Sequence, residues 1–300
     1  MVAELWQRPA NDTLTLEQWR YAASGAERAP RPVELHNELV DAGGVAAEWA
    51  WLEPSGGAVG GAGDGPVVLV FHGGGFVVCT AGSFRLLGAR LAAAGGGRAL
   101  VVDYRLAPEH PFPAAVEDCA AAYRWLLAEG VTAQRVVFFG DSAGGNLCLT
   151  TGLLARDEGL PAPAAMVLAS PSPDLTYSGA TYVTKSAVDP FSRIDNRPRT
   201  LGYYLNGADP TQPLASPLFA DLSGFPPLLI LVGPDEMHVD DCEMLAKQAA
   251  VYGVPATLEV VEGAFHTWLG YADTVPEAAA SIARIGRFIR DQVPGFRPGN

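Results

Sequence analysis

The feature that most constrains this chain is a serine between glycines, in the pattern Gly140-x-Ser142-x-Gly144. Residues 135–139 before it form a short apolar run rich in β-branched and aromatic residues, which predicts a buried strand. Residues 146–156 after it are long and apolar enough for a helix packed against a sheet. A serine in a tight strand-to-helix turn needs neighbours without bulky Cβ substituents, and the glycines meet that need. The pattern therefore predicts a nucleophile elbow that exposes the hydroxyl beside the free N–H groups of a helix N-terminus. A plain glycine-rich turn is the alternative.

The composition predicts a globular protein without affinity for polyanions. The 300 residues can bury one large core or two modest ones. Hydrophobic residues make up 49% and charged residues only 18%, which is not the composition of a disordered chain. The formal net charge of −13 argues against nucleic acid and anionic membrane surfaces as partners, because both require basic patches.

The sequence lacks targeting, membrane and metal-binding signatures. No apolar run approaches the roughly 20 residues of a membrane span, and the N-terminus lacks the basic and apolar regions of a signal peptide. We therefore expect a soluble, cytoplasmic protein. The cysteines form no CxxC pair, which predicts reduced, structural thiols and no metal knuckle; they are Cys79, Cys119, Cys148 and Cys242.

Strands and helices alternate along most of the chain, which predicts a parallel sheet covered on both faces. The first two predicted strands flank Gly43-Gly44 and are expected to pair antiparallel. The predicted strands are 33–40, 47–52, 67–71, 99–104, 135–139, 165–169, 227–232 and 256–261. The predicted helices between and after them are 84–94, 113–128, 146–156, 242–252 and 276–292.

Two further segments interrupt or precede this alternation. Between residues 170 and 220 the regular pattern stops, and the length and aromatic content of this insertion predict a cap over a site. Near the N-terminus, Thr15 is a plausible cap for a short amphipathic helix over residues 16–23. That helix either completes the core or serves as a lid.

A glycine run follows directly after the predicted strand 67–71, in His72-Gly73-Gly74-Gly75. Glycines at the end of a central strand let the backbone approach a ligand and direct N–H groups at it. A motif of this kind matches an oxyanion loop. We expect His72 to hold the loop by hydrogen bonding rather than to transfer protons.

Three chemically reactive groups each follow a predicted strand: Ser142, the acidic loop 235–241 and His266. Groups at the carboxyl ends of parallel strands gather at one edge of a sheet. A serine hydroxyl becomes nucleophilic when a base accepts its proton, and the base needs an anionic partner. The chain order of serine, acid and histidine is that of α/β-hydrolases. Among five histidines, His266 is the best base, because His36 lies on an early strand and His238 lies within the acidic loop.

Four ordered motifs together resemble the hormone-sensitive-lipase-like (type IV, GDSAG) esterases of the α/β-hydrolase superfamily. They are His72–Gly75, Tyr104–Glu109, Gly140–Gly145 and the late His266. The resemblance implies an α/β-hydrolase fold, with a mostly parallel eight-stranded sheet, helices on both faces and a helical cap. It assigns residues 1–45 to an N-terminal cap segment and 46–300 to the catalytic domain, with a cap insertion at about 180–210. It further implies an oxyanion hole formed by the backbone N–H groups of Gly73, Gly74 and Ala143.

The acid of the predicted triad has two candidates, since this family usually carries Asp-Pro-Leu-x-Asp at that point and this chain departs from the pattern. An ungapped match from Asp240 makes Glu236 the acid, and Asp235 is the alternative. Asp240 is expected to support the loop through hydrogen bonds. Met237 and His238 stand where the family has Pro-Leu.

The sequence thus predicts a serine carboxylic-ester hydrolase that acts on short-chain or small acyl esters through Ser142, Glu236 and His266. One alternative is a tailoring lactonase or deacetylase of a specialised metabolite. Another is a non-catalytic ligand receptor on a hydrolase scaffold, although such receptors typically lack the histidine. The expected partner is a small ester or lactone substrate; no metal or organic cofactor is expected, and a homodimer is compatible with the family.

Overall fold

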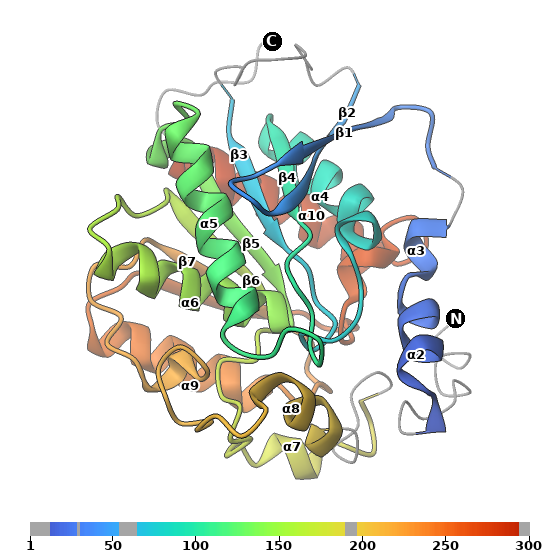
Figure 1. The fold of residues 1–300 in the computed structure, drawn as a ribbon, viewed down its shortest axis with the longest axis vertical. Helices are drawn as coiled ribbons and strands as arrows, with labels where there is room; N and C mark the ends of the chain where they lie inside the picture. The colour runs from blue at the N-terminus through green and yellow to red at the C-terminus, as the bar shows by residue number, and fades with distance from the viewer. Residues whose placement is uncertain (1–12, 29–30, 54–64, 190–196, 294–300) are drawn as a thin grey trace.

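The structure of the protein is a computed structural model, which describes residues 13–28, 31–53, 65–189 and 197–293 (Figure 1). Its strands are β1 (Leu35–Asp41), β2 (Ala46–Leu52), β3 (Val67–Phe71), β4 (Arg98–Val102), β5 (Val136–Asp141), β6 (Ala165–Ala169), β7 (Leu228–Val232) and β8 (Ala256–Val260). They form one eight-stranded sheet in the order β1-β2-β4-β3-β5-β6-β7-β8. Strands β3 to β8 run parallel, and β2 alone runs in the opposite direction, antiparallel to both of its neighbours, β1 and β4. The mostly parallel eight-stranded sheet predicted from the sequence is therefore confirmed.

Helices cover both faces of the sheet and also lie beyond its carboxyl edge. The α-helices are α2 (Leu16–Ala23), α3 (Gly25–Arg28), α4 (Ala81–Gly95), α5 (Ala114–Ala128), α6 (Ala143–Asp157), α7 (Thr181–Thr184), α8 (Arg197–Leu205), α9 (Val239–Val251) and α10 (Pro276–Gln292). Short 3₁₀ turns occur at η2 (Ala133–Arg135), η4 (Pro217–Phe219) and η5 (Trp268–Tyr271).

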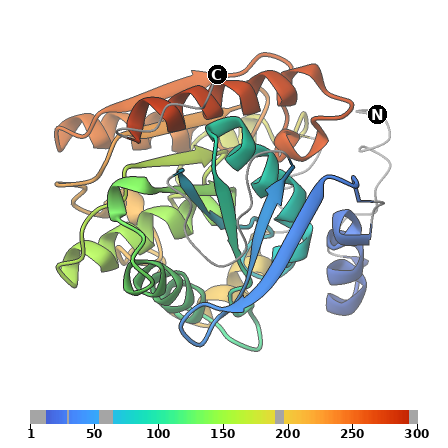
Figure 2. The same cartoon turned by 90° about the horizontal axis from the view of Figure 1, so that it is seen from above.

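The core consists of two apolar layers, one on each face of the sheet. Helices α5, α6 and α9 pack with side chains such as Leu69 and Phe138, whereas α4 and α10 pack with Val70 and Val167. Successive strand residues face opposite sides, so a strand buried on both faces must be apolar throughout. Figure 2 shows α5 and α10 on opposite sides of the sheet.

The register of the parallel strands brings their ends, and the loops that follow, to one edge. Phe71 at the end of β3 pairs with Gly140 near the end of β5, and Asp141 pairs with Ala169 at the end of β6. The glycine run after β3 and the serine after β5 therefore begin side by side. The same register continues across the sheet, where Val232 at the end of β7 pairs with Val260 at the end of β8.

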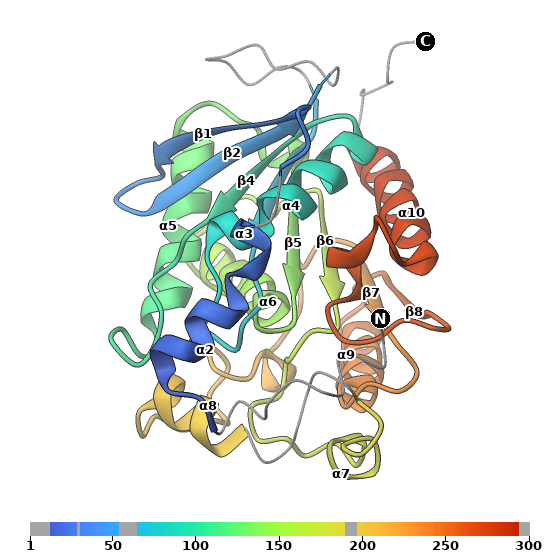
Figure 3. The same cartoon turned by 90° about the vertical axis from the view of Figure 1, so that its right-hand side faces the viewer.

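The insertion after β6 and the N-terminal helix contact each other over this edge (Figure 3). In α8, Arg199 donates to the Leu14 carbonyl at 2.9 Å, and its guanidinium lies over the Trp19 ring of α2. Tyr204 of α8 stacks on Phe76 in the loop after β3, with ring centroids 3.7 Å apart. Because Trp19 also belongs to the main core cluster, α2 both completes the core and contacts the inserted segment.

The N-terminal part of the chain contributes to the sheet as well. Strand β1 lies within the range 1–45 that the family resemblance assigns to a cap segment, yet it pairs with β2 along its whole length. Thr15 caps α2 as predicted, in a reciprocal capping box with Gln18. Among the helices of the described segments, none combines the length and apolarity needed to cross a membrane.

Gly144 provides a test of the close contact between α6 and β3. A Cβ at Gly144 would lie 1.9 Å from the Phe71 carbonyl oxygen, so the two backbones cannot keep their separation if it is replaced. We expect Gly144→Ala to lower the free energy of unfolding by about 3 kcal/mol or more, at the upper end for overpacking, as measured by chemical denaturation.

The matched control is Gly202→Ala in α8, where a Cβ would meet nothing within 4 Å. Relief of the glycine penalty should stabilise this variant by up to about 1 kcal/mol. Equal stability of Gly144→Ala and the wild type would contradict the close backbone contact.

Candidate active site

Ser142 occupies the turn between β5 and α6 in a backbone conformation that residues with a Cβ rarely adopt. Its φ is 56° and its ψ is −116°, so the surrounding structure must hold the turn. Glycine makes the turn sterically possible, because a Cβ at Gly140 would lie 2.1 Å from the Gly144 carbonyl oxygen. The Ser142 amide donates to the Ala169 carbonyl at 2.9 Å and ties the turn to β6. The side chain does not cap α6, which leaves its hydroxyl available to other partners.

A continuous chain of hydrogen bonds joins Ser142, His266 and Glu236. Ser142 Oγ lies 2.9 Å from His266 Nε2, and His266 Nδ1 lies 2.8 Å from Glu236 Oε2. The three residues follow β5, β8 and β7, so they meet at the carboxyl edge where the sequence predicts them. All three side chains are buried. This is the arrangement in which an imidazole can accept a hydroxyl proton while a carboxylate fixes its tautomer.

The second oxygen of Glu236 is held by the loop after β6 and by the start of its own loop. Glu236 Oε1 accepts a hydrogen bond from Ser170 Oγ at 2.8 Å and one from the Gly233 amide at 2.6 Å. These bonds fix the plane of the carboxylate, which leaves Oε2 directed at His266.

Asp235 and Asp240, two other acidic residues of this loop, have partners other than His266. Asp235 is exposed and forms an ion pair with Lys185, with the nitrogen and oxygen 3.1 Å apart. Asp240 Oδ2 accepts from the Thr181 amide at 2.9 Å, so it links the acidic loop to α7 in the insertion. Of the two acids that the sequence left open, the structure brings Glu236 and not Asp235 to the histidine.

Burial and the neighbouring carboxylate act in opposite directions on His266. Burial lowers the pKa of its imidazole, but the hydrogen bond and the negative charge of Glu236 outweigh this effect and raise the pKa above its ordinary value of 6.5. Glu236 thus favours the protonated imidazole, the form that a general base acquires when it has taken a proton.

The glycine run after β3 passes close to this turn. A Cβ at Gly73 would lie 3.0 Å from the Asp141 carbonyl oxygen, and one at Gly74 would lie 2.2 Å from the Val78 carbonyl oxygen. Gly74 has a φ of 111°, a conformation open mainly to glycine. A side chain at Gly73 would therefore crowd the residue that precedes Ser142, whereas one at Gly74 would clash within the loop of the glycine run itself.

The backbone N–H groups of Gly73, Gly74 and Ala143 donate no hydrogen bond to any residue that the structure describes. Ala143 is the first residue of α6, where the initial amides of a helix have no partner within it. Unpaired amides beside a reactive hydroxyl can bind developing negative charge.

His72 holds the glycine run through partners other than Ser142. Its Nδ1 lies 2.7 Å from the Gly73 carbonyl oxygen, and its ring stacks on Tyr104 with centroids 4.0 Å apart. Tyr104 also donates its hydroxyl proton to the His72 carbonyl at 2.7 Å. Burial lowers the pKa of His72 to about 4, although the bond to the Gly73 carbonyl raises it. A neutral, hydrogen-bonded ring agrees with the expected supporting role.

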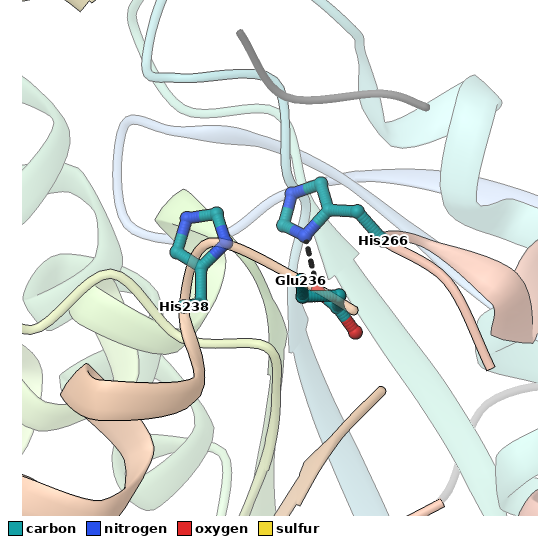
Figure 4. A group of neighbouring side chains, drawn as sticks. All are labelled: Glu236, His238 and His266. Atoms are coloured by element: carbon teal, nitrogen blue, oxygen red, sulfur yellow. Dashed lines mark hydrogen bonds and ion pairs between the residues drawn. The ribbon is translucent and has the colours of Figure 1, made fainter. Parts of the chain in front are cut away.

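The sequence reasoning missed a second histidine at this site. His238 is fully buried, and its ring stacks on His266 with centroids 4.5 Å apart and planes inclined by 11° (Figure 4). Its Nε2 lies 2.9 Å from Nη2 of Arg197, the first residue of α8. The available signal was the departure of Met237-His238 from the Pro-Leu of the family pattern.

Glu236, His238 and His266 also place potential metal-ligating atoms within 4.8 Å of one another. Their geometry does not fit a shared ion, because the nitrogen lone pairs of two stacked, nearly parallel rings do not converge. Both ring nitrogens of His266 and Nε2 of His238 already have hydrogen-bonding partners. Within the described part of the chain, this trio is better explained as a packed hydrogen-bonding cluster.

Comparison with known proteins places this geometry in a family. Residues 68–270 match the model of a family with the α/β-hydrolase fold. The chain belongs to the α/β-hydrolase family. The matched region includes the glycine run, the elbow, the acidic loop and His266.

Several relatives of this hydrolase are named for ester or acetyl hydrolysis. An acetyl-hydrolase of Streptomyces hygroscopicus is 40% identical over 253 residues, which cover 84% of this chain and 82% of the relative. An esterase of Acinetobacter venetianus is 30% identical over 223 residues and 74% of each chain.

Solved structures agree over nearly the whole hydrolase. An esterase of the bacterial hormone-sensitive lipase family is 40% identical, with a TM-score of 0.91 over 97% of this chain and 96% of the other. The esterase EstE5, in crystals soaked with p-nitrophenyl butyrate, is 38% identical, with a TM-score of 0.90 over the same shares. The family-level resemblance predicted from the sequence is therefore confirmed, and the protein is a hydrolase of the hormone-sensitive-lipase-like esterase group.

Replacement of Glu236 should reveal its influence on the histidine. Glu236→Gln preserves the shape of the side chain but removes the charge that raises the His266 pKa. Burial then acts without that opposing charge, so we expect the pKa to fall below its wild-type value. An NMR titration of the His266 ring measures this shift directly.

Asp235→Asn is the matched control, because it removes a carboxylate from the adjacent position without touching His266. We expect it to leave the pKa of His266 unchanged. A larger shift in Asp235→Asn than in Glu236→Gln would mean that the wrong carboxylate is assigned to the histidine.

Proposed function

We propose that this hydrolase cleaves carboxylic esters of small acyl groups, with Ser142 as nucleophile, His266 as general base and acid, and Glu236 as the acid partner of His266. The observation that carries the proposal is the hydrogen-bonded chain from Ser142 Oγ through His266 to Glu236 Oε2. The assembled chain also favours catalysis over the alternative of a ligand receptor on this scaffold.

The first step is attack on the ester. His266 Nε2 accepts the proton of Ser142 as the hydroxyl oxygen bonds to the carbonyl carbon, and Glu236 stabilises the imidazolium that forms. A pKa of His266 above 6.5 makes this proton transfer more favourable, provided the pH keeps the resting imidazole neutral. The carbonyl oxygen gains the negative charge of the tetrahedral intermediate.

We assign the oxyanion hole to the N–H groups of Gly73, Gly74 and Ala143. Fixed amides that are already unpaired need no reorganisation when the oxyanion forms, and the N-terminal end of α6 adds its positive dipole. The neighbouring carboxyl of Asp141 has a pKa raised to about 7 by burial, with His266 lowering it and Glu236 raising it. At neutral pH a fraction of the Asp141 carboxyl groups is therefore protonated, which reduces the negative charge near the oxyanion.

The second half of the reaction releases the acyl group. The protonated His266 gives its proton to the leaving alkoxide as the bond between carbonyl carbon and ester oxygen breaks, which leaves an acyl group on Ser142. A water molecule then gives a proton to His266 and attacks the acyl carbon. As the second intermediate collapses, the bond from the acyl carbon to Ser142 Oγ breaks, His266 returns its proton to Ser142, and the carboxylic acid is released.

The similarity to an acetyl-hydrolase and to an esterase soaked with a butyryl ester supports small acyl groups as substrates. The acetyl-hydrolase also favours a second candidate, the deacetylation of a specialised metabolite. Both candidates use the same residues and differ only in the leaving group, so substrate comparison separates them.

Removal of the nucleophile tests the mechanism. We expect Ser142→Ala to lower kcat for p-nitrophenyl acetate by a factor on the order of 10⁶, as found when a serine nucleophile is removed from a triad. Ser223→Ala, an exposed serine in a loop before β7, is the matched control and should keep full activity. Near-normal turnover by Ser142→Ala would exclude the proposed nucleophile.

A panel of p-nitrophenyl esters tests the acyl preference. Acetyl and butyryl esters should show kcat/KM values at least about tenfold above that of the decanoyl ester, a difference well within what pocket size achieves. Faster hydrolysis of acetylated alcohols than of p-nitrophenyl acetate would favour the deacetylase candidate, and a preference for the decanoyl ester would contradict the small-acyl assignment.

A further inference from the structure

The ring of His238 packs against the proposed base and links it to the inserted helix α8. We propose that His238 is a positioning residue, which holds the imidazole of His266 in line with Ser142 and transmits the position of α8 to it. This inference rests on the proposed function of His266. It is carried by a stacked pair of rings and by the bond from His238 to Arg197.

Two perpendicular restraints fix the ring of His266. Glu236 Oε2 holds Nδ1 within the plane of the ring, but a single hydrogen bond still permits rotation about the axis of that bond. The face of His238, 4.5 Å away and inclined by only 11°, blocks that rotation on one side. With both restraints present, Nε2 stays directed at Ser142 Oγ.

Arg197 determines the protonation state and orientation of His238. A guanidinium has only donors, so Nε2 of His238 must accept and its proton must reside on Nδ1. The ring is therefore neutral. Burial lowers its pKa well below the ordinary value, as do the facing charges of His266 and Arg197. The other ring that faces it, Tyr182, lies 5.8 Å away and carries no charge at neutral pH.

Neutrality of His238 matters for the reaction, because His266 becomes positively charged during each acyl transfer. A second imidazolium in face-to-face contact would oppose that charge. A neutral ring instead presents its electron-rich face to the cation, an interaction of the cation–π kind.

One nitrogen of the His238 ring adds nothing to the stability of the fold. His238 Nδ1 is buried and has no hydrogen-bonding partner among the residues that the structure describes. An unpaired buried donor is destabilising, so the stability of the core gives no reason for the N–H at this position. A role in the site accounts for this arrangement better than a role in the core.

Arg197 in turn is held by aromatic rings of the insertion. Its guanidinium lies over the rings of Tyr177 and Tyr182, at 4.8 and 5.3 Å from their centroids, and donates to the Tyr177 hydroxyl at 3.3 Å. Helix α8 also lies over the glycine run, where a Cβ at Gly75 would be 2.8 Å from Thr200 Cγ2. The same helix therefore contacts both the proposed oxyanion loop and, through Arg197 and His238, the proposed base.

The experiment compares His238→Leu, His238→Phe and Arg197→Met with the wild type, using p-nitrophenyl acetate. We expect His238→Leu to lower kcat by a factor between about 10 and 100, as small misplacements of a reacting group do, with KM within about twofold of wild type because the substrate is not contacted. Arg197→Met, which frees His238 to rotate, should lower kcat in the same direction.

His238→Phe distinguishes the effect of the stacked ring from the effect of its hydrogen bond to Arg197. Phenylalanine keeps a flat face against His266 but cannot accept from Arg197, so its kcat should lie between those of His238→Leu and the wild type. The matched control is His36→Leu. His36 lies on the edge strand β1 and stacks on Trp51, with ring centroids 5.6 Å apart. The replacement should leave both kcat and KM unchanged.

Two results would overturn the inference: wild-type kcat in both His238→Leu and Arg197→Met, or a loss confined to KM. Circular dichroism confirms that each variant is folded, and Arg197→Met keeps the test open if His238→Leu does not fold. If the wild type itself hydrolyses no ester, the proposed function fails separately. Positioning is then tested by the NMR signals of the His266 ring, which should shift or broaden in His238→Leu and would remain unchanged if His238 had no influence.

Discussion

The strained turn at Ser142 is the constraint on which the rest of the site depends. A backbone with φ of 56° and ψ of −116° persists only if its surroundings hold it. Here β5 and β6 fix one side of the turn, and the first turn of α6 fixes the other. The close approach of α6 to the end of β3, possible only with glycine at position 144, brings the start of α6 next to the residues that lead into the glycine run.

Charge at the site is arranged around one buried carboxylate. Glu236 divides its two oxygens, so that Ser170 and Gly233 hold one and His266 binds the other. The remaining titratable rings are kept neutral by burial, with lowered pKa values at His72 and His238. In the proposed mechanism, this leaves His266, paired with Glu236, as the ring that becomes positively charged in a low-dielectric site.

Local patterns predicted most of the fold, because strands buried on both faces are continuous apolar runs. All eight predicted strands occur, with boundaries shifted by at most a few residues; the first runs from Leu35 to Asp41 where 33–40 was predicted. The least predictable element was the insertion after β6. Its short helices are held by long-range contacts, such as Tyr204 on Phe76 and Arg199 on Trp19, that leave no periodic signal in the sequence.

The sequence by itself determined the sheet, the strained serine and the order in which serine, acid and histidine follow their strands, because these depend on local spacing and composition. Only the tertiary structure decided which acid of the loop meets His266 and what packs against its ring. Asp235 and Glu236 are adjacent in sequence, yet one faces solvent and Lys185 while the other faces the buried imidazole. The direction of a loop side chain depends on its three-dimensional surroundings, and for His238 those surroundings include an arginine 41 residues away.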